Sequence, residues 1–93
     1  MSDLLKDDDV ASRLEDSDWQ REDDEIVREL KFADFATAMA YVNRVAQEAE
    51  EANHHPDILV HGWNKVRLTL STHSEGGLTD ADFQMASRID ALS

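Results

Sequence analysis

Three of the four histidines in this chain lie in two short segments that could together transfer protons. His54 and His55 are adjacent and follow Glu50, whereas His73 comes later in the chain and precedes Asp82. Imidazole has an unperturbed pKa of about 6.5, so it can both donate and accept protons near neutral pH. The pattern therefore indicates general acid/base chemistry. The alternative is that these histidines are ordinary polar residues at a helix end and on a strand surface.

A metal site is the other chemistry that histidines and carboxylates can support, because zinc binds both. In an extended chain, however, the side chains of His54 and His55 point in divergent directions, which disfavours a shared ion. The chain has no cysteine, so disulfides and thiolate metal sites are excluded. His61 lies outside the two segments and is interpreted as an ordinary surface residue.

A helix over residues 34–52 is predicted to position the first two histidines. Asp34 can cap its start, and apolar residues spaced three or four positions apart form one stripe along it. The stripe consists of Phe35, Met39, Val42, Ala46 and Ala49. Pro56 restricts its own backbone and that of the residue before it, so the helix must end before the His-His-Pro sequence. The two histidines are thus expected just past a helix end.

The N-terminal part of the chain is expected to form a short amphipathic helix within residues 3–18, with an acidic first turn that suits the helix dipole. A half-buried strand should follow from Ile26 to Phe32. In that strand Leu30 and Phe32 lie on one face, whereas Ile26 and Arg28 fit the alternation less well.

His73 is expected near the end of a β-hairpin. Residues 58–61 form a short strand, Gly62 and Asn64 supply turn chemistry, and residues 65–72 alternate valine and leucine with polar side chains. Provided that the strand extends far enough, the same alternation places His73 on the face away from the leucines. His73 is then not a core histidine.

A final helix is predicted to begin with Thr79 as its cap and Asp82 as the reciprocal partner of a capping box. The residues that it buries are Phe83, Ala86 and Ile89. Together these elements give an α+β fold, in which a four-stranded antiparallel sheet carries helices packed on one face. A chain of 93 residues cannot divide its core, so residues 1–93 are expected to form a single domain.

The formal net charge of −12 narrows the choice of partners. A phosphate backbone would be repelled, so direct nucleic-acid binding is rejected as the primary function. The chain start resembles no secretion signal and no apolar run is long enough to cross a membrane, so a soluble cytoplasmic protein is expected. The dispersed acidity predicts a halophilic source with a salty cytoplasm, where salt screens self-repulsion. Thermal stability should then be higher in molar salt than in dilute buffer.

A specific order of residue types runs from Glu50 to Asp82. Its members are Glu50, His54-His55-Pro56, Trp63, Asn64-Lys65-Val66, Ser71-Thr72-His73, Gly77-Leu78-Thr79 and Asp82. This order resembles the signature of the pterin-4a-carbinolamine dehydratases, a family that includes dimerisation cofactors. The resemblance extends upstream through Trp19 and residues 30–35. It departs from the animal pattern by one extra residue between Pro56 and Trp63, which is interpreted as a lengthening of the hairpin at a Gly62 bulge.

The resemblance implies a metal-free enzyme that needs no cofactor and dehydrates a 4a-hydroxytetrahydropterin to the quinonoid dihydropterin during tetrahydropterin recycling. The family's catalytic trio maps onto His54, His55 and His73. Within the trio we assign His54 and His73 as the acid/base pair and His55 as the residue that holds the ring. The further residues expected to bind substrate are Asn53, Ser71, Thr72 and Ser74.

Three more residues have two interpretations each. Glu50 lies near a helix C-terminus, where the dipole disfavours anions, so it either accepts a hydrogen bond from a histidine or belongs to the acidic surface. Trp63 forms either a wall for the flat ring or hairpin packing. Asp82 could support catalysis, although the capping box already explains it.

The resemblance leaves other functions open. Animal members also serve as dimerisation cofactors of a homeodomain transcription factor, so a non-catalytic interaction module is one alternative, although such a module does not need the histidine trio. A dehydratase acting on a pterin of the molybdenum-cofactor route is another. Relatives of the family associate through sheet edges and a helix face, so a homodimer or homotetramer is expected.

Overall fold

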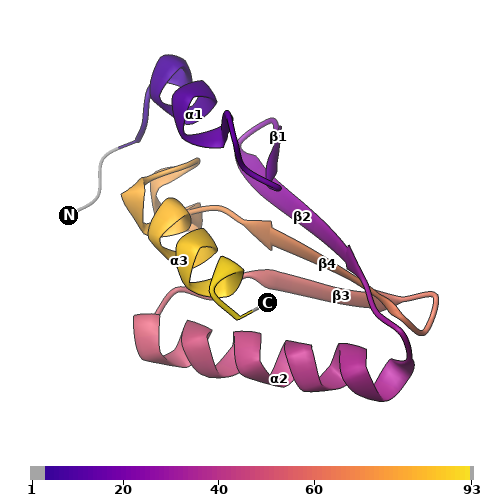
Figure 1. Cartoon of the computed structure of the whole chain (residues 1–93). Helices are drawn as coiled ribbons and strands as arrows, with labels where there is room; N and C mark the ends of the chain where they lie inside the picture. Colours follow the sequence, from indigo (N-terminus) through magenta and orange to yellow (C-terminus); the bar gives the residue numbers. More distant parts are fainter. Residues whose placement is uncertain (1–3, 93) are drawn as a thin grey trace.

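Four strands form one antiparallel sheet in the order β1-β2-β4-β3 (Figure 1). The computed structural model describes residues 4–92, so both ends of the predicted domain and the first residue of the predicted N-terminal helical region lie outside the described residues. The elements are α1 (Asp7–Leu14), β1 (Gln20–Glu22), β2 (Glu25–Lys31), α2 (Phe35–Ala52), β3 (Asp57–His61), β4 (Lys65–Leu70) and α3 (Asp80–Asp90). The predicted α+β fold with a four-stranded antiparallel sheet is confirmed.

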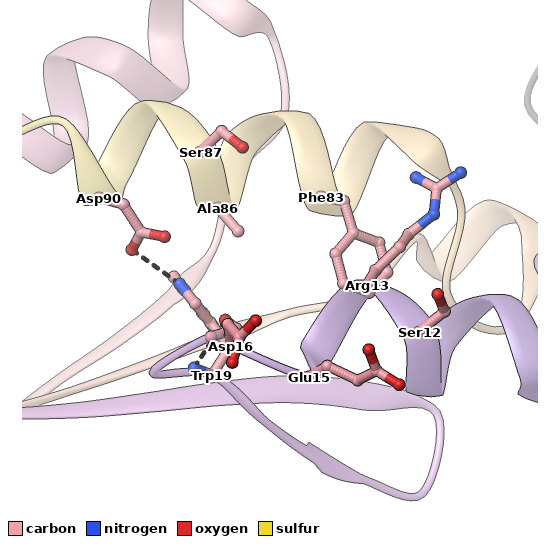
Figure 2. A pocket seen from close by; sticks show the side chains of 10 residues that line it. Ser12, Arg13, Glu15, Asp16, Trp19, Phe83, Ala86, Ser87 and Asp90 are labelled. Carbon is pink, nitrogen blue, oxygen red and sulfur yellow. Dashed lines mark hydrogen bonds between the residues drawn. The ribbon is translucent and has the colours of Figure 1, made fainter.

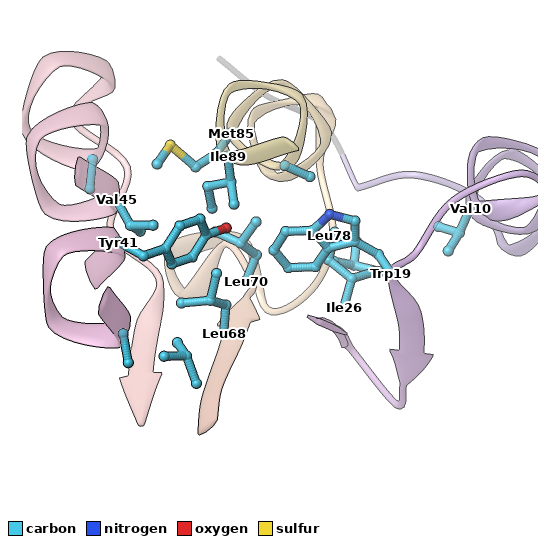
Figure 3. Close-up of a cluster of buried hydrophobic side chains, with 14 residues drawn as sticks. Val10, Trp19, Ile26, Tyr41, Val45, Leu68, Leu70, Leu78, Met85 and Ile89 are labelled. Carbon is cyan, nitrogen blue, oxygen red and sulfur yellow. The ribbon is translucent and has the colours of Figure 1, made fainter. Parts of the chain in front are cut away.

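One face of the sheet carries the hydrophobic core and is covered by α2 and α3 (Figures 1 and 3). The cross-strand pairs of β2 and β4 on this face are Ile26 with Leu70, Arg28 with Leu68, and Leu30 with Val66. Ile26 therefore follows the strand alternation, contrary to expectation, and is fully buried. Arg28 is the charged residue among these pairs, and its guanidinium binds Asp90 at 2.6 Å.

The buried face of α2 agrees with the predicted stripe only in part: Ala49 is buried and Val42 packs against the core as predicted, but the other buried residues lie outside the stripe. Its buried residues are Ala38, Tyr41, Val45 and Ala49. Phe35 is instead 54% exposed, and Ala46 is exposed as well. Because the first turns of α2 carry apolar residues on all sides, hydrophobic spacing alone could not select the buried face. The face that is buried brings the ring of Tyr41 to a centroid distance of 5.0 Å from that of Phe32.

Both ends of α2 are where the sequence predicted them. The side chain of Asp34 accepts a hydrogen bond from the backbone N–H of Thr37 at 2.7 Å. Hydrogen bonding by Thr37, through its side chain first and its backbone N–H second, lowers the pKa of Asp34, because it favours the charged carboxylate. The helix finishes at Ala52, before Pro56.

The helix α3 begins with the predicted capping box of Thr79 and Asp82. The hydrophobic residues that it buries are Met85, Ala86 and Ile89. Met85 was not predicted, and Phe83 is only partly buried because it lies at the edge of the core beside α1. There the guanidinium carbon of Arg13 lies 5.3 Å from the centroid of the Phe83 ring.

The N-terminal helix α1 is shorter than the predicted region and contributes Val10 to the core. Trp19, which follows α1, is 2% exposed and donates its indole N–H to Asp90 at 2.9 Å. Figure 3 shows Trp19 between the sheet and α3. Within residues 4–92, no helix is both long and apolar enough to span a bilayer.

Candidate active site

His54 lies at the turn that ends α2. Asn53 adopts a left-handed conformation with φ 52°, which asparagine tolerates better than most residues. The backbone N–H groups of Asn53 and His54 donate to the carbonyls of Glu50 and Ala49, at 3.4 and 3.1 Å respectively. This is the Schellman pattern of helix termination, and it leads the chain away from α2 so that the His54 ring meets the start of α3.

The imidazole of His54 is bonded to a fully buried carboxylate. Its Nε2 atom lies 2.6 Å from Oδ1 of Asp82, and the His54 side chain is 17% exposed. Oδ2 of Asp82 accepts two more hydrogen bonds, from Thr72 Oγ1 at 2.8 Å and from the Thr79 backbone N–H at 2.9 Å. The buried carboxylate therefore has the hydrogen-bond partners that its burial requires.

The two threonines that hold Asp82 are also bonded to each other, with 2.8 Å between their Oγ1 atoms. Since the Thr72 hydroxyl gives its proton to Asp82, the Thr79 hydroxyl donates to Thr72. This network joins the end of α2, the segment after β4 and the start of α3. Thr79 was predicted only as a helix cap, and its spacing from Asp82 was the signal that could have placed it in the site.

This arrangement can support proton abstraction. Asp82 acts only as an acceptor toward its three neighbours, so His54 must donate from Nε2. In the neutral ring, Nδ1 then carries the lone pair and is able to accept a proton. The adjacent carboxylate both fixes this tautomer and stabilises the imidazolium that forms, as it does in other histidine–carboxylate pairs.

His55 forms a second histidine–carboxylate pair, in which its Nε2 atom bonds to Oε2 of Glu50. Both side chains face solvent, with 56% of His55 and 76% of Glu50 exposed. The geometry corresponds to the interpretation in which Glu50 accepts a hydrogen bond from a histidine. Because both partners are solvated, this pair restrains the His55 ring much less than Asp82 restrains His54.

His73 lies in a turn rather than on a strand. The strand β4 ends at Leu70, so the predicted extension to residue 72 is wrong. Thr72 instead pairs with Gly77 in an isolated bridge, and the chain between them forms the 3₁₀ turn His73–Glu75. Strand alternation therefore does not determine the direction of the His73 side chain, although this residue is exposed, as predicted for a residue outside the core.

The turn places His73 beside an acidic loop. His73 and Ser71 line a recess of about 330 Å³ together with Asp23, Asp24 and Glu25. Within residues 4–92, no hydrogen bond or ion pair joins His73 to either of the other two site histidines. The connection runs through the chain, because His73 directly follows the threonine that bonds to Asp82.

The other predicted site residues are placed as follows. Asn53 and Ser74 are exposed, next to His54 and His73 respectively, and Ser71 donates its hydroxyl to the Asp24 carbonyl at 2.8 Å. Trp63 is not brought to the histidines of its own chain, because the length of β3 separates it from His54. In the part of the chain that is described, no group of three or more metal-ligating side chains could hold an ion.

A larger cavity of about 510 Å³ lies between α1 and α3 (Figure 2). Trp19, Phe83 and Ala86 form its apolar part, and Figure 2 shows the hydrogen bond from Trp19 to Asp90 at one side. None of the three site histidines lines this cavity. It is therefore separate from the candidate active site.

Comparisons with known proteins, by sequence and by structure, both find members of one family. The family model for pterin 4 alpha carbinolamine dehydratase matches residues 3–92. Proteins named "Putative pterin-4-alpha-carbinolamine dehydratase" include one from Nocardia farcinica, 48% identical over 99% of this chain and 97% of its own length. Another, from Thermomicrobium roseum, is 46% identical over 96% of both chains.

Two solved structures share the fold. The crystal structure of a transcriptional coactivator/pterin dehydratase from Brucella melitensis has a TM-score of 0.90 and 35% identity, and covers 97% of this chain and 98% of that one. A pterin dehydratase-like protein identified as a RuBisCO assembly factor in the alpha-carboxysome has a TM-score of 0.63 and 28% identity over 80% of this chain and 84% of that one. The chain described here belongs to the pterin 4 alpha carbinolamine dehydratase family.

Proposed function

We propose that this protein dehydrates 4a-hydroxytetrahydropterin to quinonoid dihydropterin and water. The observation that carries the proposal is the His54 imidazole held by the buried Asp82 at 2.6 Å, in a chain of the pterin carbinolamine dehydratase family. The pair provides a general base of fixed tautomer, which is the group that this elimination needs. We further propose that the reaction takes place in the cytoplasm.

The reaction breaks the bond between carbon 4a and its hydroxyl oxygen. A base takes the proton from N5, and the electron pair of the N5–H bond forms the double bond between N5 and carbon 4a. The electron pair of the C–O bond leaves with the hydroxyl oxygen, which is protonated to water. We assign the base to Nδ1 of His54 and the acid to His73, with His55 holding the ring. Each proton transfer of this kind contributes about 10²–10⁴ in rate. N5 loses one proton and the leaving oxygen gains one. The protons therefore balance, and no cofactor is required.

The test adds purified protein to freshly generated 4a-carbinolamine and follows the ultraviolet change. His54→Ala and His73→Ala should each remove most of the acceleration over the spontaneous reaction. His61→Ala is the matched control, since this exposed histidine lies at the far end of β3 and should leave the rate unchanged. Unchanged rates in both active-site variants would refute the assignment.

A non-catalytic interaction role is the second candidate. One structural relative is named a transcriptional coactivator as well as a pterin dehydratase, and the other, a pterin dehydratase-like protein, is named a RuBisCO assembly factor. That role predicts that a protein lacking His54 and His73 still complements a deletion strain, whereas the enzymatic role predicts that it does not.

A pterin of the molybdenum-cofactor route is a further candidate substrate, to be compared in the same assay. For the assembly we propose a homodimer or homotetramer, which light scattering would measure.

A further inference from the structure

The end of the sheet opposite the candidate active site carries a row of basic side chains. Lys31 of β2 pairs directly with Lys65 of β4, and Lys65 pairs with His61 of β3. Their neighbours Leu30 and Val66 form the adjacent pair on the core face. Because side chains alternate along a strand, the three basic residues share the open face of the sheet.

Neither lysine forms an ion pair within the described residues 4–92, although the protein carries a net charge of −12. The cations that form ion pairs among residues 4–92 are Arg13, Arg21, Arg28, Arg67 and Arg88. Lys31 and Lys65 are not among them, and like charges directly opposite each other destabilise a sheet. The Lys65 side chain lies beside Gly62. A Cβ atom added to Gly62 would be 3.6 Å from the Nζ atom of Lys65. Among residues 4–92, the nearest carboxylate in the recess beside these lysines is that of Glu29, and no ion pair offsets the contact of the two like charges.

Trp63 extends from the tip of the same hairpin and is 62% exposed. Its backbone has φ 58°, and the N–H of Asn64 bonds to the carbonyl of Gly62 at 2.7 Å, which closes a γ-turn around Trp63. The positive-φ form of this turn is rare and strained, above all for a bulky residue. Asn64 anchors the turn through two hydrogen bonds to the backbone of Phe32, at 2.8 and 2.9 Å. A strained and anchored turn thus holds a large indole in solvent.

We propose that Lys31, His61, Lys65 and Trp63, the basic–aromatic patch, bind an acidic segment of a partner polypeptide that also carries an apolar side chain. The lysines would pair with its carboxylates and the indole would cover its apolar group. A polypeptide fits better than a small ligand, because the patch is a hairpin end with only an open recess of about 270 Å³ beside the lysines, whereas small ligands require enclosure. The patch and the candidate active site lie at opposite ends of the β3–β4 hairpin, so the two proposals stand or fall separately.

The test measures the fluorescence anisotropy of a labelled peptide of alternating glutamate with leucine and phenylalanine, titrated with the full-length protein. The Lys31→Gln/Lys65→Gln variant should weaken binding about tenfold, since each exposed ion pair contributes modestly. Trp63→Ser should weaken it about tenfold or more, as expected for a central aromatic contact. Arg44→Gln and Phe35→Ser are the matched controls, because they remove a cation outside the patch and another exposed aromatic ring.

Three results would overturn the proposal: equal binding of a peptide with glutamine in place of glutamate, unaltered binding by the double lysine variant, or sedimentation showing self-association that this variant abolishes. The last result would identify a second copy of the chain as the occupant.

The melting temperature of the double variant should equal or exceed that of the wild type, because a like-charge pair is removed. Its dehydratase rate should be unchanged, which separates this test from the one for the active site.

Discussion

The two histidine–carboxylate pairs of this protein are built from neighbouring residues but differ in how firmly they are held. His54 bonds to Asp82, which is fully buried and accepts two further hydrogen bonds, whereas His55 bonds to Glu50 in open solvent. A buried charge that loses a partner is costly, but an exposed pair can open and be replaced by water. The comparison shows that burial of the carboxylate decides whether a histidine–carboxylate pair fixes the ring or leaves it free to move.

The largest effect should come from Asp82→Asn. In either orientation of the new amide, its NH₂ group faces a group that now donates a hydrogen bond to Asp82, so one hydrogen bond is lost. The tautomer of His54 is also no longer fixed. We expect the dehydration rate to fall by about a hundredfold or more and the free energy of unfolding to fall by about 2 kcal/mol. Ultraviolet assays and urea denaturation measure the two effects. A fully active variant would show that the buried pair does not set the ring.

Thr72→Val should have an intermediate effect. It removes the hydroxyl that donates to Asp82 while nearly conserving the shape of the side chain. A loss of about 1 kcal/mol in the free energy of unfolding is expected, with a smaller loss of activity than in Asp82→Asn. Thr69→Val, on the open face of β4, is the control. If the two valine variants behave alike, the Thr72 hydrogen bond contributes nothing specific.

Tyr41 extends the comparison to a buried polar group without a partner, since its hydroxyl makes no hydrogen bond among the described residues. Burial raises the pKa of Tyr41, nearby Arg28 lowers it, and Asp90 raises it, with a net upward shift from 10.0. Tyr41→Phe should therefore raise the free energy of unfolding by about 1 kcal/mol.

The same shift fixes the sign of a pH effect. The folded state disfavours the tyrosinate, so this contribution to stability is complete below about pH 10 and is lost as the pH rises through the folded-state pKa. Denaturation of Tyr41→Phe should lack this component of the alkaline loss. A phenylalanine variant that is less stable at neutral pH would indicate a hydrogen bond, for example to an ordered water.

Glu50→Gln should have the smallest effect. Both partners of this pair are exposed, so the free energy of unfolding should change by about 0.5 kcal/mol or less. The dehydration rate should change by less than the rate in Thr72→Val. A change as large as that of Asp82→Asn would erase the distinction between the two pairs and make Glu50 an essential part of the site.

Much of the fold could be predicted from local signals. The Asp34 cap, the helix stop before Pro56 and the Thr79–Asp82 capping box each depend on residues close together in the chain, and all three are present. The buried face in the first turns of α2 could not be predicted, because apolar residues surround these turns and only packing against Phe32 and the sheet selects Tyr41.

The members of the candidate site remain a prediction from the residue types, and its geometry could not be predicted from the sequence. The histidines follow from the residue types, whereas the pairing of His54 with Asp82 joins residues that only the packing of α3 beside α2 brings together. The turn at His73 depends on the bridge between Thr72 and Gly77, which strand alternation does not reveal. Contacts between distant segments therefore account for what the pattern missed.

The carboxylate of Asp82 has one further consequence, since it starts α3 and orients His54 at the same time. Fraying of the first turn of that helix would release the imidazole even while the sheet stays intact. If the proposed dehydratase activity is present, heat inactivation should then precede global melting, and the loss of rate would report the opening of this helix end alone. A sequence change that loosens this end would then lower the activity before it lowers the global stability of the fold.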